Sequence, residues 1–304
     1  MLDWKEDDGK AIRRVPAIEG DWWRICEMPD LGELNGPDPQ RQHVVDHGFI
    51  QAANGKWQLW ACIRGTAVSR LLYGWEGDSL EEGPWEPRGV VARARAEYGE
   101  AAGPPEAIGA PFFARFDGVY YCFYHSSGIC VMTSEDGVHY TRKLNDEGHS
   151  VLYRDGGRDV MMLKIGDRFF SYSAVSTVAR DGWKRGFVIV RTSEDLEHWS
   201  DYTIVCEGGR AGNGPVSPES PFVVQLDGCF YLFRATSTDF KTYVYRSRDP
   251  YHFGVNDDSK LVAVLPVKAP EIVHHEGKWY ISDLADFQGV KLARLRWDED
   301  RSPR

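Results

Sequence analysis

Five segments of the chain share one pattern, and this internal repeat constrains the fold more than any other feature of the sequence. In each segment an apolar run leads to a turn that contains glycine, and an aromatic-rich run follows the turn. Asn-Gly and Asp-Gly between two such runs are strong signals for a β-hairpin. The segments are residues 46–65, 110–127, 158–174, 219–236 and 269–285, with turn glycines Gly55, Gly118, Gly166, Gly228 and Gly277.

More strands are predicted after each hairpin. A third run follows every hairpin, and three of these runs end in related turns, within ICVMTSEDGVHY, FVIVRTSEDLEHW and YVYRSRDPYHF. The middle segments add a fourth run, such as YTIVCEG and LVAVLP. Four antiparallel strands in roughly 50–60 residues, five times over, predict an all-β chain that forms a five-bladed β-propeller. A β-sandwich built from regular hairpins is the alternative.

The ends of the chain are predicted to meet. The fifth repeat lacks a fourth strand, and the run EGDWWRICE at residues 19–27 is suited to supply it and close the ring. No boundary interrupts the repeats, so residues 1–304 are expected to form one propeller domain. Residues 90–102 are the single stretch with a helical pattern, and they are expected to form a helix or loop between blades.

The composition limits which partners and which cellular location are expected for the chain. Lys+Arg 36 against Asp+Glu 46 gives a net charge of −10, which argues against nucleic acid and membranes as partners. The six cysteines show neither metal-site spacing nor a disulfide framework. The acidic first residues lack the apolar core of a secretory signal, so a cytoplasmic location is expected. Nothing in the sequence indicates an oligomeric state.

Acidic residues stand where the first strand of four repeats begins. They are Asp46, Asp159, Glu219 and Glu271, and the second repeat has Ala110-Pro111 there. Inner strands line the axis of a propeller, so these carboxyls are predicted to converge, and their repulsion is tolerated mainly where chemistry uses it. Cleavage of a glycosidic bond needs one protonated carboxyl and one carboxylate. For each acid the alternative is an ordinary loop carboxylate, and Glu271 could instead hold Lys268.

The chain resembles the five-bladed propeller glycoside hydrolases of families 43, 62, 117, 32 and 68, and family 43 above all. The resemblance covers all five repeats and rests on VVDHGF, on the RD of GGRDVMMLKIGDRFFSYSA and on the E of SPESPFVVQLDGCFYLF. It implies that Asp46 is the base, that Asp159 is a third carboxylate which orients the acid, and that Glu219 is the general acid. The chain departs from the family pattern at His47 and Val160, where these families usually carry proline.

A second set of residues is predicted to bind the sugar. The second strand of each hairpin returns to the end of the axis where the first strand begins, so its last residues should face the same pocket. Ordinary polar strand ends are the alternative for each of them. The second strands supply Arg64, His125, Arg234 and Asp283 to the predicted set of sugar-binding residues. Arg158 and Glu271, which stand where first strands begin, complete the set. The three arginines in this set could supply the triad that a sialidase needs, but the trio of carboxyls fits hydrolysis of neutral sugars better.

No cofactor is required by this chemistry, and no metal ligands are predicted. Some relatives carry a structural Ca²⁺ on the axis, but no ligand spacing in this sequence indicates one. His274 and His275 are adjacent on a predicted strand, so their side chains point to opposite faces and cannot bind one ion together.

The sequence therefore predicts an exo-acting glycoside hydrolase that removes a small furanosyl or pentosyl unit from an oligosaccharide. Glu219 is expected to have a raised pKa, because burial and nearby carboxylates disfavour its charged form. Asp46 lacks the flanking Asn and Pro of the retaining relatives, which favours inversion. The alternatives are a non-catalytic sugar-binding propeller, a retaining family 32-like fructosidase or transglycosidase, and a phosphorylase.

Overall fold

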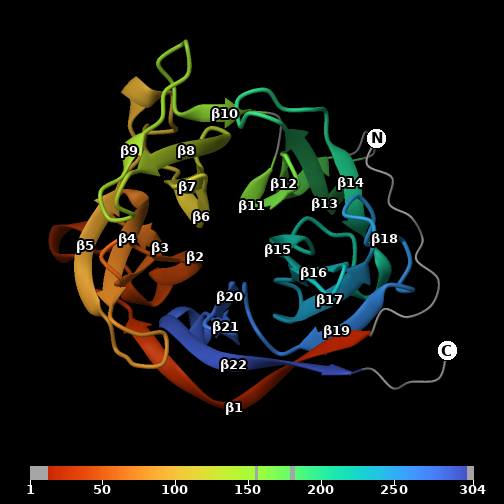
Figure 1. Cartoon of the computed structure of the whole chain (residues 1–304). Coiled ribbons are helices and arrows are strands. Elements are labelled where there is room, and N and C mark those ends of the chain that lie inside the picture. The colour runs from red at the N-terminus through yellow and green to blue at the C-terminus, as the bar shows by residue number, and fades with distance from the viewer. Residues whose placement is uncertain (1–12, 155–156, 179–181, 300–304) are drawn as a thin grey trace.

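The computed structural model describes residues 13–154, 157–178 and 182–299. Each of the five repeated segments forms a β-hairpin, and each hairpin belongs to a separate sheet. Figure 1 shows the five sheets arranged around a central axis, with the first strand of each hairpin innermost. The prediction of an all-β, five-bladed β-propeller is therefore confirmed.

Blades one to three follow one another along the chain. Blade one consists of β2 (His43–Gln51), β3 (Trp57–Thr66), β4 (Ser69–Gly77) and β5 (Glu86–Ala92). Blade two begins with β6 (Gly109–Phe116), β7 (Val119–His125) and β8 (Ile129–Ser134). Blade three consists of β11 (Arg158–Ile165), β12 (Arg168–Val178), β13 (Lys184–Ser193) and β14 (Thr203–Glu207).

Blades four and five complete the ring. Blade four consists of β15 (Glu219–Leu226), β16 (Cys229–Ala235), β17 (Thr242–Ser247) and β19 (Leu261–Leu265). Blade five consists of β20 (Ile272–His275), β21 (Lys278–Asp283), β22 (Gly289–Glu299) and β1 (Arg14–Glu27).

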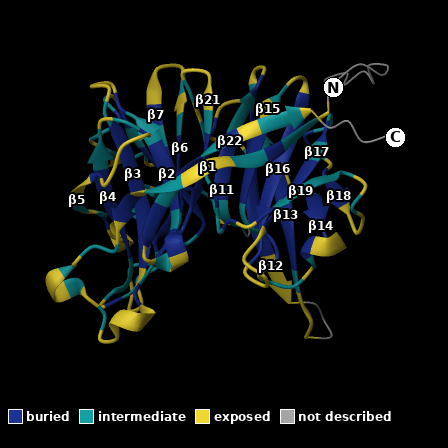
Figure 2. Cartoon of the chain, turned by 90° about the horizontal axis from the view of Figure 1, so that it is seen from below, coloured by how far each residue is buried: buried dark blue, intermediate teal, exposed yellow. Residues whose placement is uncertain are grey.

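The ring is closed by strands from the two ends of the chain. β1 pairs antiparallel with β22, from Arg14 opposite Glu299 to Glu27 opposite Gly289. Figure 2 shows the two strands side by side. The predicted closing strand is confirmed, although it begins at Arg14, earlier than the predicted residue 19, and its register shifts twice.

Two blades carry more than the four predicted strands. In blade two the outer edge is split into β9 (Thr141–Arg142) and β10 (Val151–Tyr153), which both pair with β8. In blade three the edge strand β14 pairs in parallel with β18 (Gly254–Val255), a short strand that comes from the blade-four part of the chain. The extra pairing covers an edge that would otherwise present free backbone groups.

In the described part of the chain, helical structure is confined to single turns. Residues 90–102 hold the end of β5 and one such turn, so the helical pattern there does not produce an α-helix. The described 3₁₀ turns are Gly32–Leu34, Pro39–Arg41, Ala96–Tyr98, Gly209–Ala211 and Ala285–Phe287. Each of these turns has three residues, and none of the helices in the described ranges could reach across a membrane.

The related turns after the third strands are structural. In blade two the Asp136 side chain accepts hydrogen bonds from the backbone of Val138 and His139, and its Oδ2 lies 2.7 Å from His139 Nδ1. In blade three Asp195 repeats this arrangement with His198, at 2.8 Å. Because each of these two aspartates binds within its own turn, the turns stabilise their blades.

Side chains fill the spaces between the blades and part of the axis. Figure 2 shows that the buried residues lie in the strands, with the exposed ones mainly in the connections. Phe112 of blade two and Phe222 of blade four meet near the axis, with ring centroids 5.9 Å apart. The six cysteines are buried free thiols, as expected for small apolar residues within strands.

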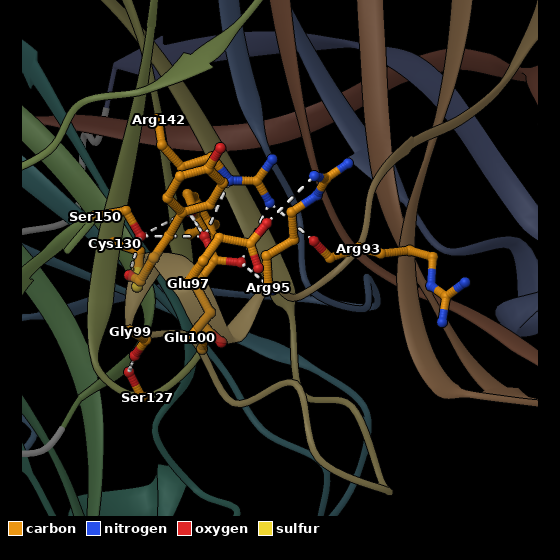
Figure 3. A network of polar contacts seen from close by, with 12 residues as sticks. Arg93, Arg95, Glu97, Gly99, Glu100, Ser127, Cys130, Arg142 and Ser150 are labelled. Atoms are coloured by element: carbon orange, nitrogen blue, oxygen red, sulfur yellow. Dashed lines mark hydrogen bonds and ion pairs between the residues drawn. The ribbon is translucent and has the colours of Figure 1, made fainter. Parts of the chain in front are cut away.

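A buried carboxylate fastens the connection between blades one and two. Glu100, whose side chain is fully buried, accepts hydrogen bonds from Ser150 Oγ at 3.1 Å, from Arg142 Nε at 3.0 Å and from the Arg95 backbone N–H at 2.8 Å. The hydroxyl of Tyr124 also donates to it. Figure 3 shows how this network joins the segment after β5 to blade two.

We expect Glu100→Ala to lower the free energy of unfolding by roughly 3–5 kcal/mol, because Arg142 would stay largely buried without its carboxylate. Glu100→Gln keeps the shape and should cost less. Urea denaturation measures both. Glu97→Ala is the control, since Glu97 forms an exposed pair with Arg95 and should change stability by less than about 0.5 kcal/mol. A Glu100→Ala loss no larger than the control would contradict the role of the network.

Candidate active site

One unusual backbone position recurs at the start of every inner strand. A residue other than glycine has a positive φ there, which is rare outside turns and strained sites. In four blades the position coincides with a shift in the ladder between the first two strands, and such bulges re-aim side chains. The five residues are Asp46 (φ 33), Ala110 (φ 49), Asp159 (φ 54), Ser220 (φ 42) and Ala269 (φ 45).

This position corrects the predicted alignment of the four acids. Asp46 and Asp159 are equivalent, since both occupy the bulge. Glu219 lies one residue before the bulge position of its blade, and Glu271 lies two residues after that of blade five. The four acids therefore do not share one structural position. The bulge, which is not visible in the alternation of apolar residues, accounts for the difference.

Ser220 links two of the predicted catalytic carboxyls. Its backbone N–H donates to Asp159 Oδ2 at 3.1 Å, and its hydroxyl donates to Asp46 Oδ1 at 3.2 Å. The positive φ of Ser220 lets one residue of blade four reach carboxyls from blades three and one. Asp46 and Asp159 are thus held beside each other on the axis.

Arg158 links the third carboxyl to the other two. Its Nη2 donates to Glu219 Oε1 at 3.0 Å and its Nε donates to Glu219 Oε2 at 3.3 Å, so the contact is bidentate. The same Nε lies 3.8 Å from Asp159 Oδ2. Hydrogen bonds to Ser176 Oγ and to the Pro215 carbonyl fix the rest of the guanidinium. The structure therefore brings the three acids together, as predicted.

Burial and mutual repulsion raise the pKa of two of these acids. The pKa of Glu219 is raised to about 7, first by burial and then by the charge of Asp159, while Arg158 acts in the opposite direction. The pKa of Asp46 is also raised to about 7, by burial and by Asp159, with Arg70 opposing. The raised pKa of Glu219 agrees with the expectation from the sequence, but the equally raised pKa of Asp46 was not foreseen.

Two connected spaces occupy this end of the axis. A cavity of about 380 Å³ is lined by residues of blades one, three, four and five, and its size is typical of small-molecule sites. A channel of about 20 Å³ continues along the axis, lined by residues from all five blades, with room for about one water molecule. Asp46 and Asp159 line both spaces, and Glu219 lines the cavity.

Four of the predicted sugar-binding residues lie at or near these spaces. Arg64 and Arg158 line the cavity. His125 lies on the other side of Arg158, in a more open hollow of about 310 Å³ that Arg158 also lines. Glu271 lines the axial channel rather than the cavity.

Arg234 and Asp283 do not line the cavity, contrary to the prediction. Arg234 is fully buried and donates to the carbonyls of Gly208 and Ser217, at 3.3 and 3.0 Å, so it supports the loop before Glu219. Its neighbour Ala235 lines the cavity, and adjacent strand residues point to opposite faces. Asp283 is buried and accepts hydrogen bonds from the backbone N–H groups of Lys268 and Ala285, at 2.7 and 3.0 Å.

Sequence reasoning missed several residues of the cavity wall. Arg70 pairs directly opposite Arg64 across the β3–β4 ladder, and this hairpin register was the signal that could have found it. Ser220 directly follows Glu219 in the sequence but was not predicted. Other missed wall residues include Lys268, Phe240 and Phe287, which lie in or next to connections between strands.

Within the ranges that the structure describes, no three His, Cys, Asp or Glu side chains are grouped as a metal site. Glu271 faces the narrow channel, and burial together with the charge of Asp46 raises its pKa well above the usual range, which disfavours its charged form. Calcium prefers charged carboxylates among its oxygen ligands, so this environment disfavours Glu271 as one of them.

No protein-family model and no curated protein matches this sequence. Among solved structures, a thermostable family-43 glycoside hydrolase is similar, with a TM-score of 0.63, 14% identity, and coverage of 89% of this chain and 96% of that one. An exo-1,5-α-L-arabinanase from a bovine ruminal metagenomic library has a TM-score of 0.57 and 17% identity, covering 86% of this chain and 95% of its own.

A third similar structure is the GH43_1 enzyme from Xanthomonas citri in complex with xylotriose, with a TM-score of 0.57, 15% identity and coverage of 84% and 87%. At these identities the likeness is one of fold. It extends over most of this chain and nearly all of each neighbour. The chain therefore has the five-bladed β-propeller fold found in these glycoside hydrolases.

Proposed function

We propose that this protein is a glycoside hydrolase that removes one terminal sugar unit from an oligosaccharide with inversion of the anomeric centre. The observation that carries the proposal is the cluster of Asp46, Asp159 and Glu219, from three blades, on the wall of one cavity at the propeller axis. The fold shared with glycoside hydrolases supports it. The arabinanase neighbour is an exo-enzyme by its name, which supports exo-action and a pentosyl unit here.

In the proposed reaction each carboxyl has one role. Glu219, in its protonated form, gives its proton to the leaving oxygen as the glycosidic C–O bond breaks. Asp46, as carboxylate, takes a proton from the water that forms the new bond to the anomeric carbon from the opposite side. Asp159, as carboxylate, keeps the pKa of Glu219 high and offsets the positive charge that develops on the sugar.

The proposal is tested with a panel of 4-nitrophenyl glycosides and short oligosaccharides of pentoses and hexoses. Release of sugar by the wild-type protein, and its loss in the Glu219→Gln variant, would support hydrolysis. Sugar binding without release from any panel member would instead favour a non-catalytic sugar-binding propeller.

The configuration of the first product distinguishes inversion from retention. We expect the opposite anomer to the substrate, because no proline or asparagine flanks Asp46 as in the retaining relatives and a water molecule would separate Asp46 from the sugar. Proton NMR during the first minutes of hydrolysis measures the anomer before mutarotation. Retention of configuration would make Asp46 a nucleophile and refute the inverting assignment.

The pH profile of kcat/KM is expected to be a narrow bell with its maximum near pH 7. Activity should rise as Asp46 ionises and fall as Glu219 loses its proton, and both carboxyls have a pKa of about 7. Removing Arg158 removes the cation that lowers the pKa of Glu219. Arg158→Met should therefore move the basic limb to higher pH.

The control for this shift is Arg168→Met, a partly exposed arginine of the same blade that pairs with Glu194. Its pH profile should match that of the wild-type protein. A basic limb that stays in place in Arg158→Met, or that moves equally in both variants, would show that Glu219 does not set it.

A further inference from the structure

Two arginines face each other across the second hairpin of blade one, which β3 and β4 form. Arg64 on β3 and Arg70 on β4 are directly opposite in the ladder, and both side chains line the cavity. Like charges directly opposite one another destabilise a sheet. Among the described residues, neither arginine forms an ion pair with a carboxylate within 4.0 Å. The hairpin thus holds two positive charges on the wall of the proposed active site that no described carboxylate contacts directly, although the charge of Arg70 acts to lower the pKa of Asp46.

The neighbours of Arg64 and Arg70 do not neutralise this charge. Arg64 Nε donates to His43 Nδ1 at 3.3 Å, and burial together with Arg64 lowers the pKa of His43, so the imidazole stays neutral. The side chain of Arg70 donates no hydrogen bond to another residue in the part of the chain that the structure describes. A Cβ at Gly109 would lie 3.5 Å from Arg70 Nη1, an ordinary contact distance, which places this guanidinium beside the first residue of β6.

The rest of the wall beside these arginines suits a sugar ring. Phe240 and Phe287 lie in contact, with ring centroids 5.8 Å apart, and Phe240 is 44% exposed. Both have a positive φ, which is strained for bulky residues and typical of functional sites. Lys268 Nζ lies 5.4 Å from the Phe287 ring centroid, and Arg64 lies over the same ring at 5.8 Å. Cationic groups therefore surround an apolar surface.

The charge of the cavity is opposite to that of the whole protein. Four cationic residues line it, against the three acids of the catalytic cluster, while the chain has a net charge of −10. Arg158 is engaged by Glu219, and Lys268 is paired with Asp286. Arg64 and Arg70 are the two cations on the cavity wall that form no ion pair with a described carboxylate.

We propose that the sugar unit bound in this cavity carries an oxyanion, such as the carboxylate of a uronic acid, and that Arg64 and Arg70 together bind it. The inference rests on the proposed glycosidase function and names its substrate class. The planar fork of each guanidinium matches two oxygens of a carboxylate, and such charge-assisted pairs are the stronger hydrogen bonds in proteins. This departs from the neutral sugar that the sequence favoured.

Binding of acidic sugars and their uncharged analogues tests this inference. D-glucuronate and D-galacturonate are compared by isothermal calorimetry at low salt with their methyl esters, which keep the ring and replace the charged carboxylate by a neutral ester. Glucose 6-sulfate and glucose 6-phosphate form a second arm, with glucose as their neutral reference. We expect at least one anionic sugar to bind roughly 10- to 100-fold more tightly than its neutral partner. Preference for the sulfate or the phosphate would identify an ester oxyanion rather than a uronate.

Variants show whether the two arginines cause the preference. Arg64→Gln and Arg70→Gln should each reduce the preference for the anionic sugar, and the double variant should abolish it. Binding of the neutral partner should change by less than about twofold, which also shows that the variants are folded. Arg88→Gln is the matched control, because Arg88 is an exposed arginine on β5 of the same blade.

Equal binding of every anionic sugar and its neutral partner, or absence of binding by all the anionic sugars, overturns the inference. So does a preference that survives in the double variant. The proposed function fails in a different way. If anionic sugars bind through the arginines but no neutral or acidic glycoside is hydrolysed, the glycosidase proposal is wrong while the anion site stands.

Discussion

Replacing Asp46 by asparagine should lower kcat/KM by roughly 10²- to 10⁴-fold, because the attacking water loses its general base. The loss should be equal for substrates with good and poor leaving groups, since Asp46 acts on the water and not on the leaving oxygen. Initial rates on a series of substituted phenyl glycosides measure this. A loss that depends on the leaving group would argue against Asp46 as the base.

The stability of Asp46→Asn separates this loss from unfolding. Asparagine still offers an oxygen to the Ser220 hydroxyl, which lies 3.2 Å from Asp46 Oδ1. The folded pKa of Asp46, about 7, exceeds the ordinary value of about 3.9, so its ionisation costs stability as the pH rises through 7. The variant should therefore melt at the same or a higher temperature than wild type at pH 8. Asp78→Asn, at an exposed site of blade one, should leave activity unchanged.

Replacing Glu219 by glutamine should have an effect that depends on the leaving group. With an oligosaccharide, whose leaving alcohol must be protonated, we expect kcat/KM to fall roughly 10²- to 10⁴-fold. With a 2,4-dinitrophenyl glycoside, whose leaving group needs no proton, the loss should be far smaller. The variant should also lose the basic limb of the pH profile, since the group that titrates there is gone.

Two outcomes would contradict the role of Glu219. One is an equal loss on both substrates, which would indicate a defect in binding or folding. The other is a basic limb that persists in Glu219→Gln. The comparison with Asp46→Asn is informative because the two variants are expected to respond differently to the leaving group. Asp159→Asn should behave like neither of these variants, since the charge of Asp159 raises the pKa of both Asp46 and Glu219.

The architecture was predictable because its signals are local. Each hairpin has a turn glycine between two short apolar runs, and all five turn glycines have positive φ in the structure. Closure by the N-terminal strand was also predictable, since the fifth repeat lacked a partner for its last strand. The additional strands β9, β10 and β18 were not predictable, because strands of two or three residues have no recognisable period.

The site was predictable in outline but not in detail. The approximate position of Asp46, Asp159 and Glu219 at the start of inner strands was enough to place them on one cavity. The offset of Glu219 from the other two depends on a one-residue bulge, which sequence alternation does not reveal. An offset of one residue also explains why Arg234 was wrongly predicted to line the cavity. Adjacent strand residues point to opposite faces, so Ala235 faces the cavity and Arg234 faces the blade core. The catalytic roles themselves stay predictions.

The pairing of β1 with β22 has a consequence for biosynthesis. β1 is translated well before its partner β22, so at roughly 5–20 residues per second it waits on the order of tens of seconds for that partner. During this time blade five does not exist, and the axis on which the three carboxyls meet has no fixed geometry. The proposed activity should therefore arise in one step, after β22 leaves the ribosome. A nascent or truncated chain that lacks β22 should bind no sugar, however well its first four blades have folded.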